Sequence, residues 1–189
     1  MKKSMLLRMA ALLAALTLLL GILTLPAAAA VPAGAAKEVV RLVNAERAKE
    51  GLPALKNNNS ALTKAAQKRA KELPLRFNSK HERPDGRAWH TVMKEYNIQY
   101  ISVGENIAYG HKSAAQVVQA WMDSPGHKKN IMDKDFTHIG VGIHEENGRL
   151  YWSQEFMRPL PVTVRILRVA LYPFQMLWLV TKTFFGMIF

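Results

Sequence analysis

The chain has 189 residues, with 26 lysines and arginines against 14 aspartates and glutamates, and a formal net charge of +12. It contains no cysteine, which excludes disulfide bonds, thiolate metal ligands and a cysteine nucleophile. The positive charge favours anionic partners such as acidic lipid head groups or wall polymers. We expect no nucleic-acid partner, because the sequence lacks a groove-reading motif and a pattern of base-stacking aromatic residues.

Residues 1–30 have the pattern of a secretory signal peptide. A positively charged start precedes an apolar run from Met9 to Leu25, and Pro26 is followed by small residues that a signal peptidase accepts. We expect cleavage near Ala30–Val31 and a protein that is secreted or held at the extracytoplasmic surface. An uncleaved anchor is the alternative, because the apolar run approaches the ~20 residues that span a bilayer.

The sequence after the signal predicts a short spacer, residues 31–36, and one domain, residues 37–160. Apolar side chains recur at helical spacing over Lys37–Glu50, and Gly51 ends this helix. A second helix is predicted over Ala61–Leu73, with a stripe of apolar side chains on one face.

The middle of the domain predicts short helices separated by irregular segments. Pro84-Asp85-Gly86 is a strong turn signal, and the segment 101–109 is either irregular or a strand. Ser113 is suited to cap the helix that follows it. The predicted helices of this region cover Arg87–Tyr96, Ser113–Trp121 and about His127–Met132.

The end of the domain predicts an antiparallel hairpin. Apolar residues alternate with other residues over 139–143 and over 150–156, as in strands with one buried face. Asn147-Gly148 between them is a favoured two-residue hairpin turn. Helices followed by a hairpin predict an α+β domain that ends near Pro159.

Four motifs are unusual for a domain with only a structural role. They are His-Glu-Arg-Pro-Asp-Gly at 81–86, Gly-Glu-Asn-Ile-Ala at 104–108, Trp-Met-Asp-Ser-Pro-Gly-His at 121–127 with Asn-Ile at 130–131, and Phe-Thr-His-Ile-Gly-Val-Gly at 136–142. In this order, and with Asn44-x-x-Arg47 in the first helix, they resemble the CAP superfamily of cysteine-rich secretory, antigen 5 and pathogenesis-related-1 proteins, in its cysteine-free bacterial branch. The resemblance implies an α-β-α sandwich with a small antiparallel sheet between helical layers.

The resemblance also implies a cleft in which two histidines and acidic side chains meet. By motif position these are His81, Glu105 and His127. Better-known members carry a second glutamate before the second histidine, and here the nearest carboxylate is Asp123. His81, Glu105, His127 and Asp123 are therefore the candidate cleft residues.

Two imidazoles and a carboxylate are a sufficient ligand set for zinc with an open position for water. His81, His127 and Glu105 are the predicted ligands for zinc or another divalent cation. Without metal, the same groups could act as general acids and bases near neutral pH. The alternatives are structural: His81 capping the turn that follows it, His127 bonding backbone groups, and Glu105 bracing its loop.

The other polar and aromatic residues of interest are predicted to be structural. Asn106 is expected to brace a loop, and Arg83 and Asp85 to shape the turn beside them. Trp121 and Trp152 occupy patterned apolar positions and are expected in the core. The histidines that match no ligand position are His90, His111, His138 and His144.

The tail, residues 161–189, leaves the family pattern. Val169–Phe189 is apolar and long enough to span a bilayer. Arg165 and Arg168 would then lie outside, against the positive-inside tendency, so a helix lying on the outer membrane surface is at least as well supported. The alternative is a tail that packs on the domain or on another subunit.

Three functions are compatible with this sequence. The favoured one is an exported domain whose cleft binds a lipid, a peptide or a cell-wall polymer. The second is a metal-assisted hydrolase that uses the same cleft, and the third is an adhesion or interaction protein with a vestigial cleft. No nucleophile lies at a recognisable spacing from a base, so the sequence leaves enzymatic activity undecided and leans against it.

Overall fold

A three-stranded antiparallel sheet forms the middle layer of the structure, a computed structural model that describes residues 30–164 and 166. The predicted signal, except for its last residue, and the apolar tail 169–189 lie outside the described residues. Within the described part, no helix has the length and hydropathy needed to cross a membrane.

The sheet has the strand order β1-β3-β2. It consists of β1 (Tyr100–Tyr109), β2 (His138–Glu146) and β3 (Arg149–Pro159), with β3 in the centre. Asn147 and Gly148 join β2 to β3 with φ angles of 52° and 74°, as a tight hairpin turn requires. The predicted hairpin is therefore confirmed.

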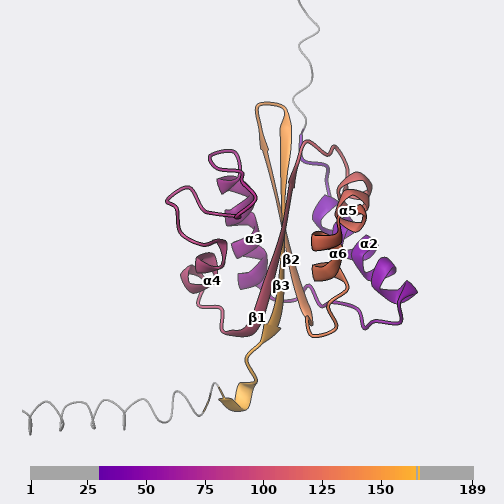
Figure 1. The fold of residues 1–189 in the computed structure, drawn as a ribbon, viewed down its shortest axis with the longest axis vertical. Coiled ribbons are helices and arrows are strands. Elements are labelled where there is room, and N and C mark those ends of the chain that lie inside the picture. Colours follow the sequence, from indigo (N-terminus) through magenta and orange to yellow (C-terminus); the bar gives the residue numbers. More distant parts are fainter. Residues whose placement is uncertain (1–29, 165, 167–189) are drawn as a thin grey trace, which may run out of the picture.

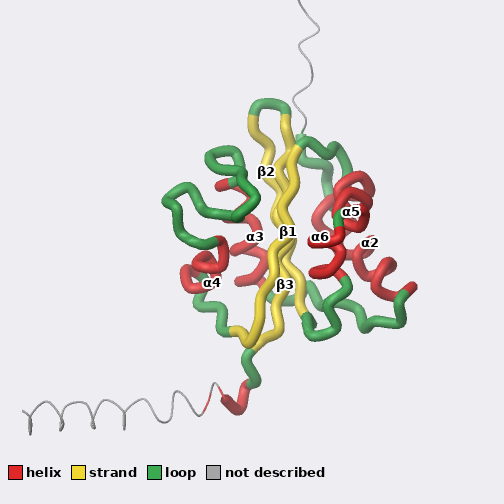
Figure 2. Tube along the Cα trace, viewed as in Figure 1, coloured by secondary structure: helices red, strands yellow, loops and turns green. Residues whose placement is uncertain are grey.

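Helices cover both faces of the sheet (Figures 1 and 2). One face carries α3 (Ser60–Glu72), with the short η1 (Trp89–Thr91) and α4 (Val92–Glu95) beside it. The opposite side carries α2 (Ala35–Lys49), α5 (Ala114–Asp123) and α6 (Pro125–Ile131). This arrangement confirms the predicted α+β class with a small antiparallel sheet between two helical layers.

Three elements differ in detail from the sequence predictions. The segment 101–109 is a regular strand, because it is paired with β3 along almost its whole length. The helix predicted over 87–96 is divided into a 3₁₀ turn and a single α turn. Helix α6 begins at Pro125, two residues earlier than predicted, because the fixed φ of proline suits the first helical position.

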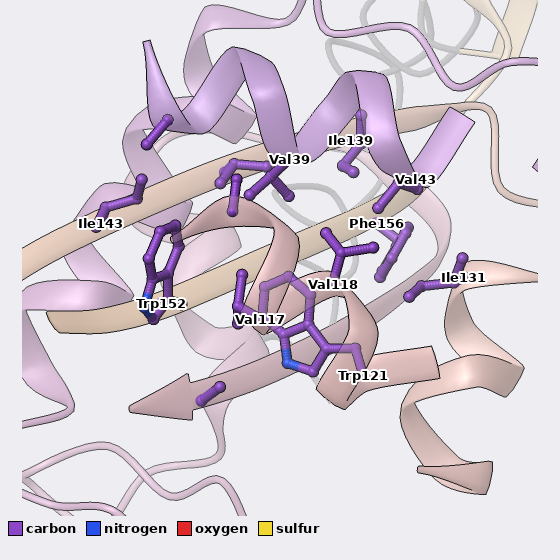
Figure 3. Packing of buried hydrophobic residues seen from close by; sticks show 14 of the residues in the cluster. Val39, Val43, Val117, Val118, Trp121, Ile131, Ile139, Ile143, Trp152 and Phe156 are labelled. Atoms are coloured by element: carbon purple, nitrogen blue, oxygen red, sulfur yellow. The ribbon is translucent and has the colours of Figure 1, made fainter. Parts of the chain in front are cut away.

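The larger hydrophobic core lies between the sheet and the layer of α2 and α5 (Figure 3). Trp121 of α5 and Trp152 of β3 are 1% and 0% exposed, which confirms them as core residues. The indole nitrogen of Trp152 donates to the carbonyl of His111 at 2.9 Å, so its polar atom is satisfied. The aliphatic side chains around them include Val39, Val43, Val117, Val118, Ile139 and Ile143.

On the other face, α3 approaches β2 closely because β2 has glycine at two positions. A Cβ atom on Gly142 would lie 2.2 Å from the carbonyl oxygen of Ala66, and one on Gly140 would lie 2.6 Å from that of Leu62. Gln67 fixes the same contact by accepting from the amide of Ile143 at 3.1 Å and donating to its carbonyl at 2.8 Å. The alternating glycines of the strand therefore set the distance between sheet and helix.

We expect Gly142→Ala to lower the free energy of unfolding by about 3 kcal/mol, since the added methyl group meets backbone and forces α3 away from the sheet. Urea denaturation followed by circular dichroism measures the change. Gly126→Ala is the control, because a Cβ atom there meets no described atom within 4 Å. Equal stability of the two variants would contradict this account of the contact.

Candidate functional site

The candidate site is built on two consecutive residues of the edge strand β1, Glu105 and Asn106. Successive side chains of a strand point to opposite faces of the sheet. Glu105 therefore faces α3, where it contacts Arg69, and Asn106 faces α6, where it contacts Asn130. Both side chains are buried. One dipeptide thus contacts both helical layers.

Glu105 holds His81, which lies in the loop after α3. The Nδ1 atom of His81 is 2.8 Å from Oε1 of Glu105. Arg69 donates to both carboxylate oxygens of Glu105, from Nε at 2.7 Å and from Nη2 at 3.3 Å. The Glu105 side chain is fully buried, whereas that of His81 is 22% exposed. The histidine is therefore the member of this group that solvent reaches.

The loop that carries His81 is held by a chain of ion pairs, which are buried around Glu72 and partly exposed at Glu95. Glu72 accepts from Arg69 at 2.9 Å and from Arg83 at 2.6 Å. Arg83 also donates to Glu95 at 2.6 Å, and the hydrogen bond to Glu72 is the main cause of its raised pKa. Arg83 thus shapes the turn from inside. Breaking such a buried pair is strongly destabilising.

On the other face of the sheet, Asn106 fixes the helix that carries His127. Its Nδ2 donates to the carbonyl of His127 at 3.1 Å and to Oε1 of Gln154 at 2.9 Å. Its Oδ1 accepts from Asn130 at 2.9 Å, and Asn130 also donates to the carbonyl of Glu105 at 3.1 Å. Asn106 therefore braces a helix against a strand, where the sequence predicted a loop.

His81 and His127 come from opposite layers, and each is bonded to β1, at the consecutive residues Glu105 and Asn106. Burial and the nearby charge of His81 both lower the pKa of His127. The structure therefore places His81 in contact with Glu105 and fixes the backbone of His127 at the next residue of the same strand.

Asp123, the fourth candidate, lies elsewhere. It is exposed at the end of α5 and accepts from Nε2 of Gln119 at 2.8 Å. Among the described residues, no hydrogen bond or ion pair joins its carboxylate to His81, Glu105 or His127. The helix end turns the side chain toward solvent, a direction that sequence spacing alone does not give.

A buried carboxyl group that the sequence analysis did not single out lies next to Glu105. Glu155 of β3 is its direct cross-strand partner and is 0% exposed. Ser153 Oγ donates to its Oε1 at 3.1 Å, and its Oε2 has no hydrogen-bond partner within residues 30–164 and 166. Burial and the neighbouring charge of Glu105 raise the pKa of Glu155 well above its ordinary value. Its surroundings therefore favour the neutral form of Glu155, whereas Arg69 and His81 favour the ionised form of Glu105.

Arg69 and Glu155 were missed for different reasons. Arg69 lies in the stripe of small and apolar residues on α3, whereas Glu155 alternates with the apolar residues of the hairpin strand, on the face that the pattern assigns to solvent and that α3 covers in the structure. The available signal was the charge itself, since an ionisable residue at a core position calls for a partner.

The three predicted metal ligands do not fit a shared metal site as they are placed. Both oxygens of Glu105 are bonded, to Arg69 and to His81. In the part of the chain that the structure describes, no three His, Asp or Glu side chains are grouped as a metal site requires. The remaining donors are the imidazoles of His81 and His127, with Glu105 positioned to orient a histidine instead of binding metal.

A groove of about 700 Å³ lies away from these histidines, where the starts of α2 and α5 meet. Residues 32–35 and 113–115 line it together with Lys37, Glu38 and Arg41. Glu38 and Arg41 are paired to each other at 2.6 Å. We regard the region around His81, Glu105 and His127 as the candidate site because side chains of both helical layers are bonded to β1 there.

Comparisons with known proteins identify relatives that match about two thirds of the chain. The chain is 42% identical over 121 residues to the uncharacterized protein YkwD of Bacillus subtilis (strain 168), covering 64% of this chain and 46% of the relative. An extracellular protein containing a SCP domain from Bacillus anthracis str. Ames matches with a TM-score of 0.60 and 26% identity, over 66% of this chain and 40% of that one.

An outer surface protein from Borrelia burgdorferi has the same fold, with a TM-score of 0.59 and 22% identity over 66% of this chain and 92% of that one. The chain spans less than half the length of the two Bacillus proteins. The sequence pattern of the Cysteine-rich secretory protein family, CAP, matches residues 40–156. With this match over more than half of its length, no cysteine and Bacillus relatives, the chain belongs to the cysteine-free bacterial branch of the CAP family.

Proposed function

We propose that this CAP-domain protein is exported and acts outside the cytoplasm, where its histidine cleft binds a lipid, a peptide or a cell-wall polymer. The signal pattern of residues 1–30 supports export. The relative from Bacillus anthracis, which is an extracellular protein, supports the same location. Membrane contact through residues 162–189 stays a prediction.

The observation that carries binding over catalysis is the state of Glu105. A carboxylate that activates water needs a free oxygen within reach of that water. Glu105 has a fully buried side chain, and its oxygens are bonded to Arg69 and His81. The groups left to face a ligand are the imidazoles, which recognise partners by hydrogen bonding.

One observation favours a metal-assisted hydrolase as the second candidate. Metal-binding histidines usually donate their other ring nitrogen to a carboxylate, and His81 contacts Glu105 through Nδ1. A zinc ion would then be held by His81 and His127, with Glu105 orienting the first of them. Zinc bound in this way would supply a polarised water.

Binding to isolated peptidoglycan and to phosphatidylglycerol vesicles tests the proposal, with co-sedimentation of the purified full-length chain as the readout. We expect His81→Ala and His127→Ala each to weaken binding to one of these probes at least tenfold, which is about 1.4 kcal/mol. His90→Ala is the matched control, because His90 is an exposed histidine outside the cleft.

The other outcomes separate the alternatives. Binding that both cleft variants leave unchanged would overturn the proposal and favour an interaction protein with a vestigial cleft. Calorimetry with zinc alone tests the second candidate: micromolar binding that both variants abolish would support it, and no binding would exclude zinc as the metal of this cleft.

A further inference from the structure

Arg69 contacts His81 at two points, one direct and one through Glu105. Its Nη2 donates to the backbone carbonyl of His81 at 3.1 Å. Its Nε donates to Glu105 at 2.7 Å, and Glu105 in turn contacts Nδ1 of His81 at 2.8 Å. A single planar guanidinium therefore fixes both the backbone and the ring of this histidine.

The backbone of His81 needs such a restraint. Its φ angle is 56°, in the left-handed region that residues other than glycine rarely adopt. Conformations of this kind persist only where the surroundings hold them, and they cluster at functional sites. The hydrogen bond from Arg69 to the His81 carbonyl is one restraint, and the hydrogen bond from the His81 amide to the Asn78 carbonyl at 3.1 Å is another.

The same contacts determine which ring nitrogen carries the proton. An ionised carboxylate only accepts hydrogen bonds, so Nδ1 of His81 must donate to Glu105. In the neutral imidazole the other nitrogen, Nε2, is then a bare acceptor. Arg69 donates to both oxygens of Glu105, from Nε at 2.7 Å and from Nη2 at 3.3 Å, and this paired contact with a guanidinium is that of an ionised carboxylate.

We propose that Arg69 is a positioning residue that holds His81 as the Nδ1–H tautomer, so that the cleft presents the Nε2 lone pair to a ligand. This inference rests on the proposed binding function, and it adds the chemistry of the contacting group. A bare imidazole nitrogen selects an N–H or O–H donor, such as an amide, a hydroxyl or an ammonium group. A group that only accepts hydrogen bonds, such as an ester carbonyl, finds no partner at this nitrogen.

Nitrogen NMR of the full-length chain, labelled with ¹⁵N-histidine and recorded in detergent at alkaline pH, tests the tautomer without any ligand. The signals of His81 are assigned as those absent from a His81→Gln variant. In the unsubstituted protein we expect a protonated Nδ1 and a bare Nε2. A protonated Nε2 would overturn the proposal whether or not the cleft binds a ligand, so this test is separate from that of the proposed function.

Arg69→Lys tests the positioning role. Lysine keeps the charge but cannot donate to Glu105 and to the His81 carbonyl in the same planar arrangement. We expect a large loss of the Nδ1–H form, toward a mixture of tautomers. Arg47→Lys is the matched control, since Arg47 is equally buried but donates to the backbone carbonyls of Pro53, Ile131 and Asp133 and has no bond to His81 or Glu105 among the described residues. It should keep the tautomer of the unsubstituted protein.

Two results would count against Arg69. One is an Arg69→Lys protein in which His81 keeps its tautomer, and the other is an equal change in both variants. Where Arg69→Lys fails to fold, as circular dichroism would show, Glu105→Gln replaces it, because an amide removes the charged acceptor while keeping its shape. An unchanged tautomer in that variant would overturn the role of the Arg69–Glu105 pair.

Discussion

Arg47→Met is expected to lower the free energy of unfolding by about 3 kcal/mol or more, because it leaves three backbone carbonyls without a donor. Arg47 is fully buried. It donates to the carbonyl of Pro53 at 2.9 Å, to that of Ile131 at 2.7 Å and to that of Asp133 at 2.8 Å. Methionine fills similar space but donates no hydrogen bond.

The missing hydrogen bond to Ile131 is also expected to loosen the candidate site, because Ile131 is the last residue of α6, the helix that carries His127. Urea denaturation measures the stability. Arg41→Met in the same helix is the control: Arg41 is exposed and pairs only with Glu38 among the described residues, so its replacement should change stability by about 0.5 kcal/mol or less. If Arg47→Met lowers the free energy of unfolding no more than Arg41→Met does, the three carbonyls must find other donors.

The order of elements could be predicted from the sequence because their patterns are local. Ser113 does cap α5, accepting from the amide of Gln116 at 3.2 Å, and Asn147-Gly148 does form the hairpin turn. The strand nature of β1 was ambiguous, since its pairing partner β3 lies far away along the chain. The α3–β2 contact at Gly142 likewise joins residues far apart in sequence.

Within the site, His81, Glu105 and His127 were predicted by resemblance, and the structure bonds His81 to Glu105 and the backbone of His127 to the neighbouring Asn106. Their relation was not predictable. Arg69 and Glu155 determine how these side chains are arranged, since Arg69 donates a hydrogen bond to the carboxylate of Glu105, which the sequence predicted as a zinc ligand. Such pairings depend on which helix faces which strand, which no spacing rule gives.

Asn44, which belongs to the same family pattern, acts by a similar long-range pairing. It exchanges two hydrogen bonds with the backbone of Leu55, at 2.8 and 3.1 Å. The motif showed that this position mattered, but only the folded chain shows that its amide holds the segment after α2.

The pair of buried carboxyl groups in the sheet should make stability depend on pH. Glu155 faces Glu105 across the strands, Arg69 from α3, and the Ser153 hydroxyl on its own strand. Its folded pKa lies well above the ordinary value of 4.5. Above pH 4.5 the folded protein therefore holds one proton more than the unfolded chain, and stability must fall as pH rises toward the folded pKa.

Glu155→Gln is expected to remove this dependence, since an amide stays neutral at every pH while keeping the size of the side chain. The stability of the unsubstituted protein should fall relative to that of the variant by up to about 1.4 kcal/mol per pH unit. The lowered pKa values of His127 and His138 act with the opposite sign, below their ordinary value of 6.5. Comparing the two proteins by urea denaturation at several pH values cancels that contribution. Parallel curves would mean that Glu155 is ionised in the folded protein, and that Arg69 must then balance two buried carboxylates instead of one.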